Sequence, residues 1–229
     1  MLKVKRIMGD IKKFNERCLD KEGIYLDYNE DDLSNMKYLI VGPDETPYQG
    51  GFYLFDIKIS KDYPFKPPSV KYISYSNTVR INPNLYQNGK VCLSVLGTWQ
   101  GPPWIAAMNL GSLAIDIQIR LNKYPLQNEP GFEKDFDHQT PNYNKITSYY
   151  NIELCVIKVL EQIELLPKKF QEIIKAKFLE NYPKYIEYLD SIKDMEGETI
   201  YCRYANSKCE YNPSLLKDKI NALYQMYKD

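Results

Sequence analysis

The segment GPDETPYQGGFYLFDIKISKDYPFKPPSVKY (residues 42–72) contains a clear strand between two stretches rich in turn residues. From Phe55 onward apolar and polar side chains alternate, so that Phe55, Ile57 and Ile59 share one side. An alternation of this period is typical of a β-strand with one buried face. The Gly, Pro and Asp residues on both sides predict turns that end the strand.

Three other runs are also rich in Tyr, Ile and Val: GIYLDYN (23–29), NMKYLIVG (35–42) and SVKYISY (69–75). β-Branched and aromatic residues favour strands. The connections between these runs are short and have no helical pattern. The sequence therefore predicts an antiparallel meander of four strands.

Helical periodicity flanks the predicted sheet. An N-terminal helix that ends before Lys21 is indicated by apolar residues at helical spacing: Val4, Ile7, Met8, Ile11, Phe14 and Cys18. Residues 109–121 are apolar on nearly all sides and predict a buried central helix. Residues 146–166 predict another helix, with Cys155 in the core.

Two more helices are predicted towards the C-terminus. The first, over residues 170–182, is expected to kink or break at Pro183, which has no amide proton. The last is expected to have Asn212 as its N-cap and Pro213 in its first turn. Its apolar stripe would be Leu216, Ile220, Leu223 and Tyr227. The predicted class is α+β, with a core over residues 1–165 and a helical extension over 166–229, packed on the core or continuing it.

Composition excludes several classes of function. The 229 residues are 44% hydrophobic, enough for a sizeable core, and 30 basic residues balance 30 acidic ones, which argues against nucleic-acid binding through bulk charge. No apolar run reaches the roughly 20 residues of a membrane span, and the charged N-terminus lacks a signal-peptide pattern. The five cysteines form no regular framework. We therefore expect a soluble protein with free thiols in a reducing compartment, the cytoplasm or in addition the nucleus.

Residues 76–108 have neither a strand nor a helix pattern. A long irregular segment of this kind is more often functional than accidental. It contains Cys92, within INPNLYQNGKVCLSVLGTW (81–99). Taken alone, a single cysteine is most often a small buried apolar residue. The Asn- and Gly-rich surroundings of Cys92 favour a functional thiol, although no histidine lies nearby to serve as a base.

These motifs together resemble the ubiquitin-conjugating enzyme family. The run Asn82-Pro83-Asn84, then Gly89 and VCLSVL with Cys92, is similar to the family's His-Pro-Asn signature, spacer and Cys-Leu pair. Residues 42–72 resemble its hairpin and its Tyr-Pro-Phe-x-Pro-Pro loop, and KRIMGDIKKF (5–14) resembles its first helix. Within the family, LGTW, NEPGFE, NYN and FQEIIKAKFLENY are most similar to the large, divergent Z-type enzymes, and next to the conjugating domain of BRUCE. The likeness covers residues 1 to about 190.

The resemblance implies a UBC-like fold: an N-terminal helix, the four-stranded meander, a long active-site loop and C-terminal helices. Residues 1–165 would be the catalytic core. An activating enzyme would use ATP to load ubiquitin, or a ubiquitin-like modifier, onto Cys92 as a thioester, and a substrate lysine would then take it, usually with a ligase. The chain itself would need no cofactor, metal, nucleic acid or membrane, and we expect a monomer. Thioester exchange needs only a partly ionised thiol, so a site without histidine suits it.

Other residues receive roles by the same resemblance. Asn84 would stabilise the tetrahedral oxyanion or hold the loop, whereas on its own it predicts an Asx turn. Something must also lower the pKa of the attacking lysine or take its proton, and Ser94, Asn128 and Glu129 are the candidates. A solvated turn is the alternative for Glu129. Asn82 stands where most of the family has His, and Ser94 stands where many members have Asp.

Two surfaces are assigned to partners. The basic face of the first helix, Lys3, Lys5, Arg6 and Lys12, is by itself a solvated charged face, and the resemblance implies that it docks the activating enzyme. The ligase would bind at Phe65, Pro67, Trp104, Ile105 and Ala106. There, WIAA departs from the family's Trp-Ser/Thr-Pro-Ala pattern. Because these surfaces overlap, the two partners should compete.

Three alternatives differ in class. An inactive UBC-fold binding module or decoy for ubiquitin or ligases is disfavoured because Cys92 is present. A cysteine hydrolase would have to pair Cys92 with His138, the single histidine, which lies in a polar loop. A zinc site at Cys202 and Cys209 lacks a further pair of ligands.

Overall fold

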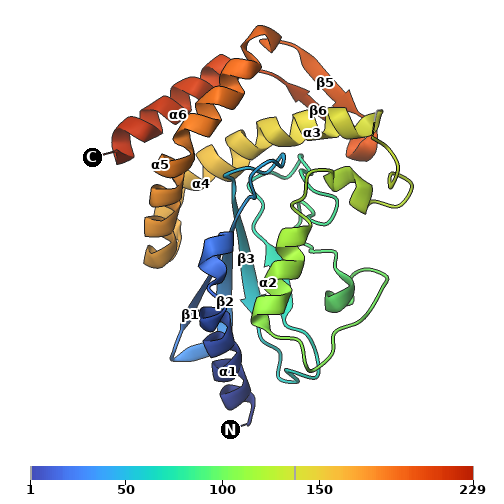
Figure 1. The fold of residues 1–229 in the computed structure, drawn as a ribbon, viewed down its shortest axis with the longest axis vertical. Coiled ribbons are helices and arrows are strands. Elements are labelled where there is room, and N and C mark those ends of the chain that lie inside the picture. Colours follow the sequence, from blue (N-terminus) through green and yellow to red (C-terminus); the bar gives the residue numbers. More distant parts are fainter. Residues whose placement is uncertain (1, 137, 229) are drawn as a thin grey trace.

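The computed structural model describes residues 2–136 and 138–228 (Figure 1). The strands are β1 (Ile24–Asn29), β2 (Asp32–Val41), β3 (Phe52–Lys58), β4 (Ser69–Tyr72), β5 (Thr199–Cys202) and β6 (Ser207–Glu210). The α-helices are α1 (Leu2–Glu16), α2 (Leu110–Ile119), α3 (Gln139–Tyr150), α4 (Lys158–Glu161), α5 (Lys168–Ser191) and α6 (Pro213–Tyr227). No helix among these residues is long and apolar enough to cross a membrane.

The predicted meander is confirmed. The first four strands form one antiparallel sheet in the order β1-β2-β3-β4, and the register places Tyr38 opposite Phe55 and Phe55 opposite Tyr72. The alternation predicted from Phe55 also holds, because Phe55, Ile57 and Ile59 are all buried in one core cluster. Cross-strand contacts between such large side chains stabilise this register, since a slip by one residue would turn them all to the other face.

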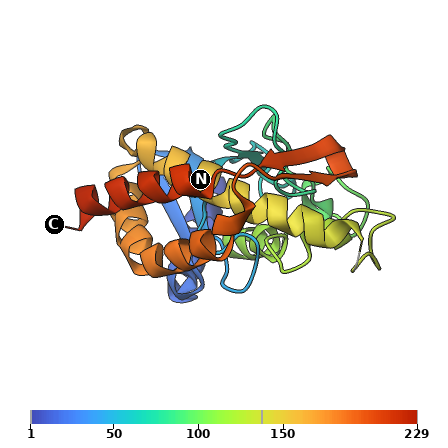
Figure 2. The same ribbon diagram turned by 90° about the horizontal axis from the view of Figure 1, so that it is seen from above.

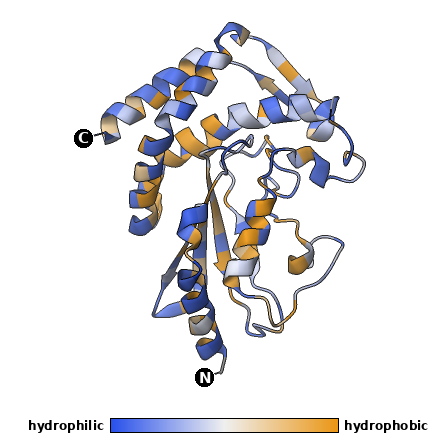
Figure 3. Ribbon diagram, in the orientation of Figure 1, coloured by the Kyte–Doolittle hydropathy of each residue, from blue (hydrophilic) through white to orange (hydrophobic). Residues whose placement is uncertain are grey.

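Both faces of the sheet are covered, by different helices. One face carries Tyr38, Phe55 and Ile57 and packs with α1 and α2. The other carries Leu39 and Leu54 and packs with α4, α5 and α6. Figure 3 shows the hydrophobic colour gathered on β3 of the sheet and on helices α2 and α4.

The first helix follows the predicted stripe only in part. Ile7, Ile11 and Phe14 are buried, but Val4 and Met8 are 54% and 46% exposed. Cys18 was expected to continue the stripe, and this is wrong: it lies beyond α1, in a left-handed conformation (φ 50°), and is exposed. The chain turns at this point, and Leu19 enters the core instead.

The predicted central helix is α2. The Asn109 side chain accepts from the Ser112 amide and the Ser112 hydroxyl accepts from the Asn109 amide, a capping box that fixes where the helix begins. Leu110, Leu113 and Ile117 are buried, whereas Ile119 is 57% exposed.

The next helical stretch begins at Gln139, earlier than predicted, and is interrupted by a π-helix at Asn151–Ile157. Asn151 is buried there, donating to the Gln49 carbonyl (3.0 Å) and accepting from the Tyr53 hydroxyl (2.6 Å). Cys155 is a core thiol as predicted, and burial raises its pKa to about 12. Figures 1 and 2 show α3 and α4 as one rod across the end of the sheet.

The C-terminal part contains more than the predicted helices. Helix α5 runs through Pro183 to Ser191, so the break considered there does not occur. Tyr185, two residues after Pro183, is buried and donates to the Gly50 carbonyl (2.7 Å). Gly50 has a φ of 69°, and a Cβ there would lie 2.8 Å from the Tyr185 hydroxyl, so this contact requires glycine.

Strands β5 and β6 form an antiparallel hairpin that sequence reasoning missed. The hairpin packs on α3 and buries Cys202 and Cys209. The final helix α6 follows the prediction, with Asn212 accepting from the Leu215 amide and Ile220 fully buried. The description of residues 166–229 as a helical extension is therefore incomplete.

Candidate active site

Asn84 and Cys92 hold the two arms of the irregular loop together. The Cys92 amide donates to the Asn84 carbonyl (2.8 Å), and Asn84 Nδ2 donates to the Cys92 carbonyl (2.9 Å). The Asn84 side chain is almost completely buried, and its Oδ1 atom has no hydrogen-bond partner among the described residues. In this conformation the Asn84 side chain stabilises the loop through Nδ2, and its Oδ1 atom can accept a hydrogen bond.

Asn82 anchors the base of the same loop. It is fully buried, and its Nδ2 atom donates to the Tyr48 hydroxyl (2.8 Å) and to the Arg120 carbonyl (2.8 Å). Its Oδ1 atom accepts from the Asn84 amide (2.8 Å), which is the predicted Asx turn, but centred on Asn82. An amide at the position where most of the family has His therefore joins the loop to the end of α2.

Cys92 is more enclosed than expected. A functional thiol in an Asn- and Gly-rich loop would be expected to reach solvent, but in the conformation described Cys92 is only 1% exposed. Its Sγ atom makes no hydrogen bond to any described residue. Thr98 fixes the backbone on both sides, because its hydroxyl accepts from the Leu93 amide (2.9 Å) and donates to the Val91 carbonyl (2.6 Å). The thiol is unpaired and its backbone is held firmly.

The three candidates for catalytic support lie in different settings. Ser94 is half-buried and begins a 3-10 helix, Ser94–Leu96, two residues after the cysteine. The side-chain oxygen of Asn128, Oδ1, accepts from Asn122 Nδ2 (3.3 Å). Glu129 lies in a turn and is half-buried, and its Oε2 accepts from the Tyr204 hydroxyl (3.2 Å), so its side chain is only partly solvated. Tyr204 is a neighbour of the site that the sequence did not predict, because it is brought there by the hairpin.

The basic face of α1 divides into two groups. Lys5 and Lys12 are exposed and Lys3 is half-buried, so these ammonium groups face solvent. Arg6 instead donates to the carbonyls of Ala106 (2.7 Å) and Met108 (2.5 Å). Its guanidinium therefore fixes the loop before α2 and is not free for a partner.

The predicted ligase surface is assembled from two loops. Phe65 is 82% exposed and Ile105 is 56% exposed, and Pro67 and Ala106 are half-buried. Trp104 is buried and its indole N–H donates to the Pro64 carbonyl (2.7 Å). The buried indole thus joins the two loops. It stabilises the predicted ligase surface from below and exposes little area on it.

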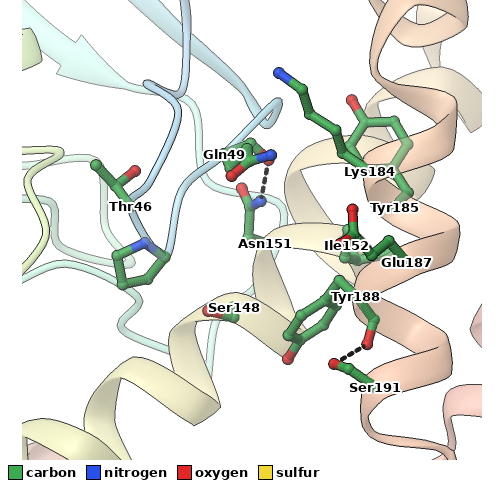
Figure 4. A pocket seen from close by; sticks show the side chains of 11 residues that line it. Thr46, Gln49, Ser148, Asn151, Ile152, Lys184, Tyr185, Glu187, Tyr188 and Ser191 are labelled. Atoms are coloured by element: carbon green, nitrogen blue, oxygen red, sulfur yellow. Dashed lines mark hydrogen bonds between the residues drawn. The ribbon is translucent and has the colours of Figure 1, made fainter.

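A cleft of about 330 Å³ lies at the seam between the β2–β3 loop, the rod and α5 (Figure 4). It contains none of the predicted site residues. Some of its polar groups are already bonded: Asn151 donates to the Gln49 carbonyl, and Lys184 pairs with Asp44, outside the lining, at 2.7 Å. The buried Tyr188 hydroxyl has no hydrogen-bond partner among the described residues. We interpret this cleft as the seam between the sheet and α5.

Comparisons with known proteins show the family of the chain. A family model described as "Ubiquitin-conjugating enzyme" matches residues 6–150. Ubiquitin-conjugating enzyme E2 Z of Xenopus tropicalis is 34% identical over 209 residues, 90% of this chain and 67% of that protein. The Homo sapiens protein of that name is 36% identical over 196 residues, 85% of this chain and 55% of that protein.

Two further likenesses extend the comparison. The Mus musculus dual E2 ubiquitin-conjugating enzyme/E3 ubiquitin-protein ligase BIRC6 is 37% identical over 176 residues, 72% of this chain and 4% of that protein. The solved E2 domain of a Toxoplasma gondii ubiquitin conjugating enzyme matches 66% of this chain and 97% of its own with a TM-score of 0.51. At 22% identity, the latter shows the fold alone.

The chain belongs to the ubiquitin-conjugating enzyme family, whose members are acyltransferases that form a thioester on cysteine. The resemblance to the Z-type enzymes and to the conjugating domain of BRUCE (BIRC6) is confirmed. The chain spans 55% to 67% of the length of the E2 Z proteins compared above. Because these relatives are named as enzymes, the inactive binding module is not favoured.

Proposed function

We propose that this protein accepts the C-terminal carboxyl of ubiquitin, or of a ubiquitin-like modifier, as a thioester on Cys92 and passes it to a lysine amine. The observation that carries the proposal is the reciprocal hydrogen bonding of Asn84 and Cys92, which places a cysteine beside an amide side chain with no base bonded to the sulfur. Such a site suits the exchange of an acyl group that is already activated.

Loading is a thiol exchange. The Cys92 thiolate attacks the thioester carbonyl carbon of the charged activating enzyme, the new S–C bond forms, and the activating enzyme's thiolate leaves with the electron pair. ATP is consumed by the activating enzyme and not by this chain. No redox change and no cofactor is needed in this step. A strong base next to Cys92 would also activate water and hydrolyse the product.

Loading also requires a local opening. Cys92 is buried in the conformation described, so side chains around it must move before a peptide tail reaches the sulfur. The 3-10 helix at Ser94–Leu96 and the following turn are the segments that adjoin Cys92 in the chain. Gly101 packs closely on Ser94, since a Cβ at Gly101 would lie 3.0 Å from Ser94 Cβ. We propose that this turn moves when the thioester forms.

Discharge passes through a tetrahedral oxyanion. The lysine amine attacks the thioester carbon, the oxyanion collapses, the Cys92 thiolate leaves, and the amine loses a proton to give an amide. Asn84 Nδ2 is the proposed donor to the oxyanion. To reach it, Nδ2 must release the Cys92 carbonyl, and only this one side-chain bond is lost because Oδ1 is unpartnered. One oxyanion donor contributes roughly 10²–10³ in rate.

The partners follow from the two surfaces. Lys3, Lys5 and Lys12 would attract an acidic surface of the activating enzyme, and Phe65 with Ile105 would form the apolar contact of a ligase. Arg6 connects α1 to the loop that carries Ile105, through the carbonyls of Ala106 and Met108. The two surfaces are therefore adjacent, which supports competition between the partners. We further propose that the protein is a monomer that works in the cytoplasm or nucleus, where thiols stay reduced.

A charging assay tests the proposal. The protein is mixed with activating enzyme, ATP and ubiquitin, and in parallel with a ubiquitin-like modifier and its own activating enzyme, and run on a non-reducing gel. We expect a shifted band that disappears with thiol reductant and is absent in Cys92→Ala. Cys92→Lys should give a band that survives reductant, because the bond is then an amide. A wild-type protein that no activating enzyme charges would refute the proposal.

A further inference from the structure

Tyr204 enters the core from a turn of the C-terminal hairpin and is 8% exposed. Ala205 and Asn206 follow it with φ of 53° and 49°, a left-handed conformation that costs non-glycine residues energy and persists only where the surroundings enforce it. The turn is held against α3, since the Arg203 amide donates to Gln139 Oε1 (2.8 Å). A strained and anchored turn thus points one aromatic side chain inward.

The ring of Tyr204 packs against the arm of the loop that leads to Asn84. The Arg80 guanidinium lies 5.3 Å from the Tyr204 ring centroid and 3.6 Å from that of Tyr86, so Arg80 contacts two aromatic faces. Arg80 Nη2 donates to the carbonyl of Pro83, the residue before Asn84. Tyr204 is therefore linked through Arg80 to the backbone carbonyl that precedes Asn84.

The hydroxyl of Tyr204 reaches the other loop of the site. It donates to Glu129 Oε2 at 3.2 Å, and no described residue bonds Oε1. Burial raises the pKa of Tyr204 well above its usual value; nearby Arg80 lowers it and Glu129 raises it. The phenol is thus protonated at neutral pH and acts as the donor to the carboxylate.

The Glu129 loop and the Asn84 loop are also tied by a second route. Asn82 Nδ2 donates to the Arg120 carbonyl at the end of α2 (2.8 Å), and Asn122 donates to Asn128, next to Glu129. The residues after α2 therefore connect the loop that carries Asn82 to the segment that carries Glu129. Tyr204 supplies the only side-chain hydrogen bond to its carboxylate among the described residues.

We propose that Tyr204 is a positioning residue for the discharge step, which makes the C-terminal hairpin part of the active site. This inference rests on the proposed conjugating function. Tyr204 holds Oε2 of Glu129 and leaves Oε1 to accept a hydrogen bond from the attacking lysine amine and then its proton. Through Arg80 the same ring steadies the loop that carries Asn84. Loading of Cys92 uses neither group and should not depend on Tyr204.

The test is Tyr204→Phe, which removes the hydroxyl and keeps the ring. Single-turnover discharge of the charged protein to free lysine is measured after the activating enzyme is quenched. We expect charging at the wild-type rate and discharge slowed about 10-fold at about pH 7. The defect should shrink towards about pH 10, because a far larger fraction of free lysine, with a pKa of about 10.4, is then neutral than at about pH 7. A general loss of structure would not be relieved by raising the pH.

Two comparisons separate positioning from stability. In a Glu129→Ala background, Tyr204→Phe should cause no further loss, because the hydroxyl acts through the carboxylate. The matched control is Tyr150→Phe, which removes a hydroxyl that donates to the Lys208 carbonyl of the same hairpin (3.1 Å) but does not contact Glu129. It should discharge like the wild type.

The outcomes are distinct. If wild type and Tyr204→Phe are both uncharged, the conjugating function itself fails. If Tyr204→Phe charges and discharges normally at neutral pH, the conjugating function stands and the role of Tyr204 is refuted. A defect of equal size at both pH values, or one that adds fully to that of Glu129→Ala, would also refute positioning and leave a structural effect.

Discussion

The side chain of Asn84 donates to the carbonyl of Cys92, while the amide of Cys92 donates back to the carbonyl of Asn84. This reciprocal pair closes the loop between them and fixes the cysteine relative to an amide group. The same contact means that Asn84 cannot serve as an oxyanion donor until its side chain rotates. The Asn84 amide therefore stabilises the loop in the uncharged protein and is also the proposed donor to the oxyanion.

Asn84→Ala should separate loading from discharge. Loading does not need the amide donor, whereas discharge to free lysine should slow by roughly 100-fold, the typical effect of one oxyanion donor. The measurement is single-turnover discharge of the charged variant beside the wild type. Discharge at the wild-type rate would remove Asn84 from the chemistry and leave it a purely structural role.

Asn82→Ala should lower the stability of the protein and leave the rate of discharge nearly unchanged. The substitution leaves the buried Arg120 carbonyl and the Tyr48 hydroxyl without a donor, which costs about 1–3 kcal/mol in the free energy of unfolding. Equilibrium denaturation in urea measures this loss. At a temperature where the variant is folded, its charged form should discharge within a few-fold of the wild type. A variant of unchanged stability that has lost discharge would place Asn82 in the chemistry.

The thiols should differ in reactivity. Cys18 is exposed, whereas burial raises the pKa of Cys155 and of Cys209 to about 12 each, so those two stay neutral at moderately alkaline pH. Alkylation of the native protein at about pH 8 should modify Cys18 first, because its thiol is accessible to the reagent. Cys92 should react more slowly than Cys18 because it is enclosed. Peptide mass spectrometry over time measures the order, and equal rates at Cys155 and Cys18 would contradict it.

Phe65→Ala should affect only the ligase-dependent reaction. Phe65 is 82% exposed, so its truncation should change the free energy of unfolding by less than about 0.5 kcal/mol. Charging and discharge to free lysine should be unchanged, and stimulation by a cognate ligase should be lost. Leu165, 80% exposed and outside the two loops that Trp104 joins, is the matched control as Leu165→Ala. Full stimulation of Phe65→Ala would rule out this surface.

Local patterns predicted most of the fold. The alternation after Phe55 and the Asn212-Pro213 start of α6 depend on neighbours in the chain, and both are confirmed. The π-helix and the passage of α5 through Pro183 depend on distant partners: Asn151 bonds to Gln49 and Tyr53, and Tyr185 bonds to Gly50. These contacts join residues about 100 or more positions apart. Patterns of neighbouring residues in the sequence therefore cannot predict them.

The site was predictable in its motif and not in its surroundings. Spacing and resemblance predict Cys92 and Asn84 as site residues, but the burial of Cys92 could not be predicted, because an Asn- and Gly-rich loop suggests exposure. The contact of Tyr204 with Glu129 joins residues 75 positions apart through a hairpin that was missed. Its only signal was the alternation of Ile200, Cys202 and Tyr204, which is short and lies among charged residues.

The central claim is that Cys92, and not a more exposed thiol, carries the modifier. Its most direct test is to charge the protein in the presence of ATP, block the free thiols, and identify the residue in thioester linkage by peptide mass spectrometry. The modifier's C-terminal carboxyl is predicted on Cys92 in the charged protein, with Cys18 blocked by the alkylating reagent. Attachment at exposed Cys18, with Cys92 still a free buried thiol, would contradict the account.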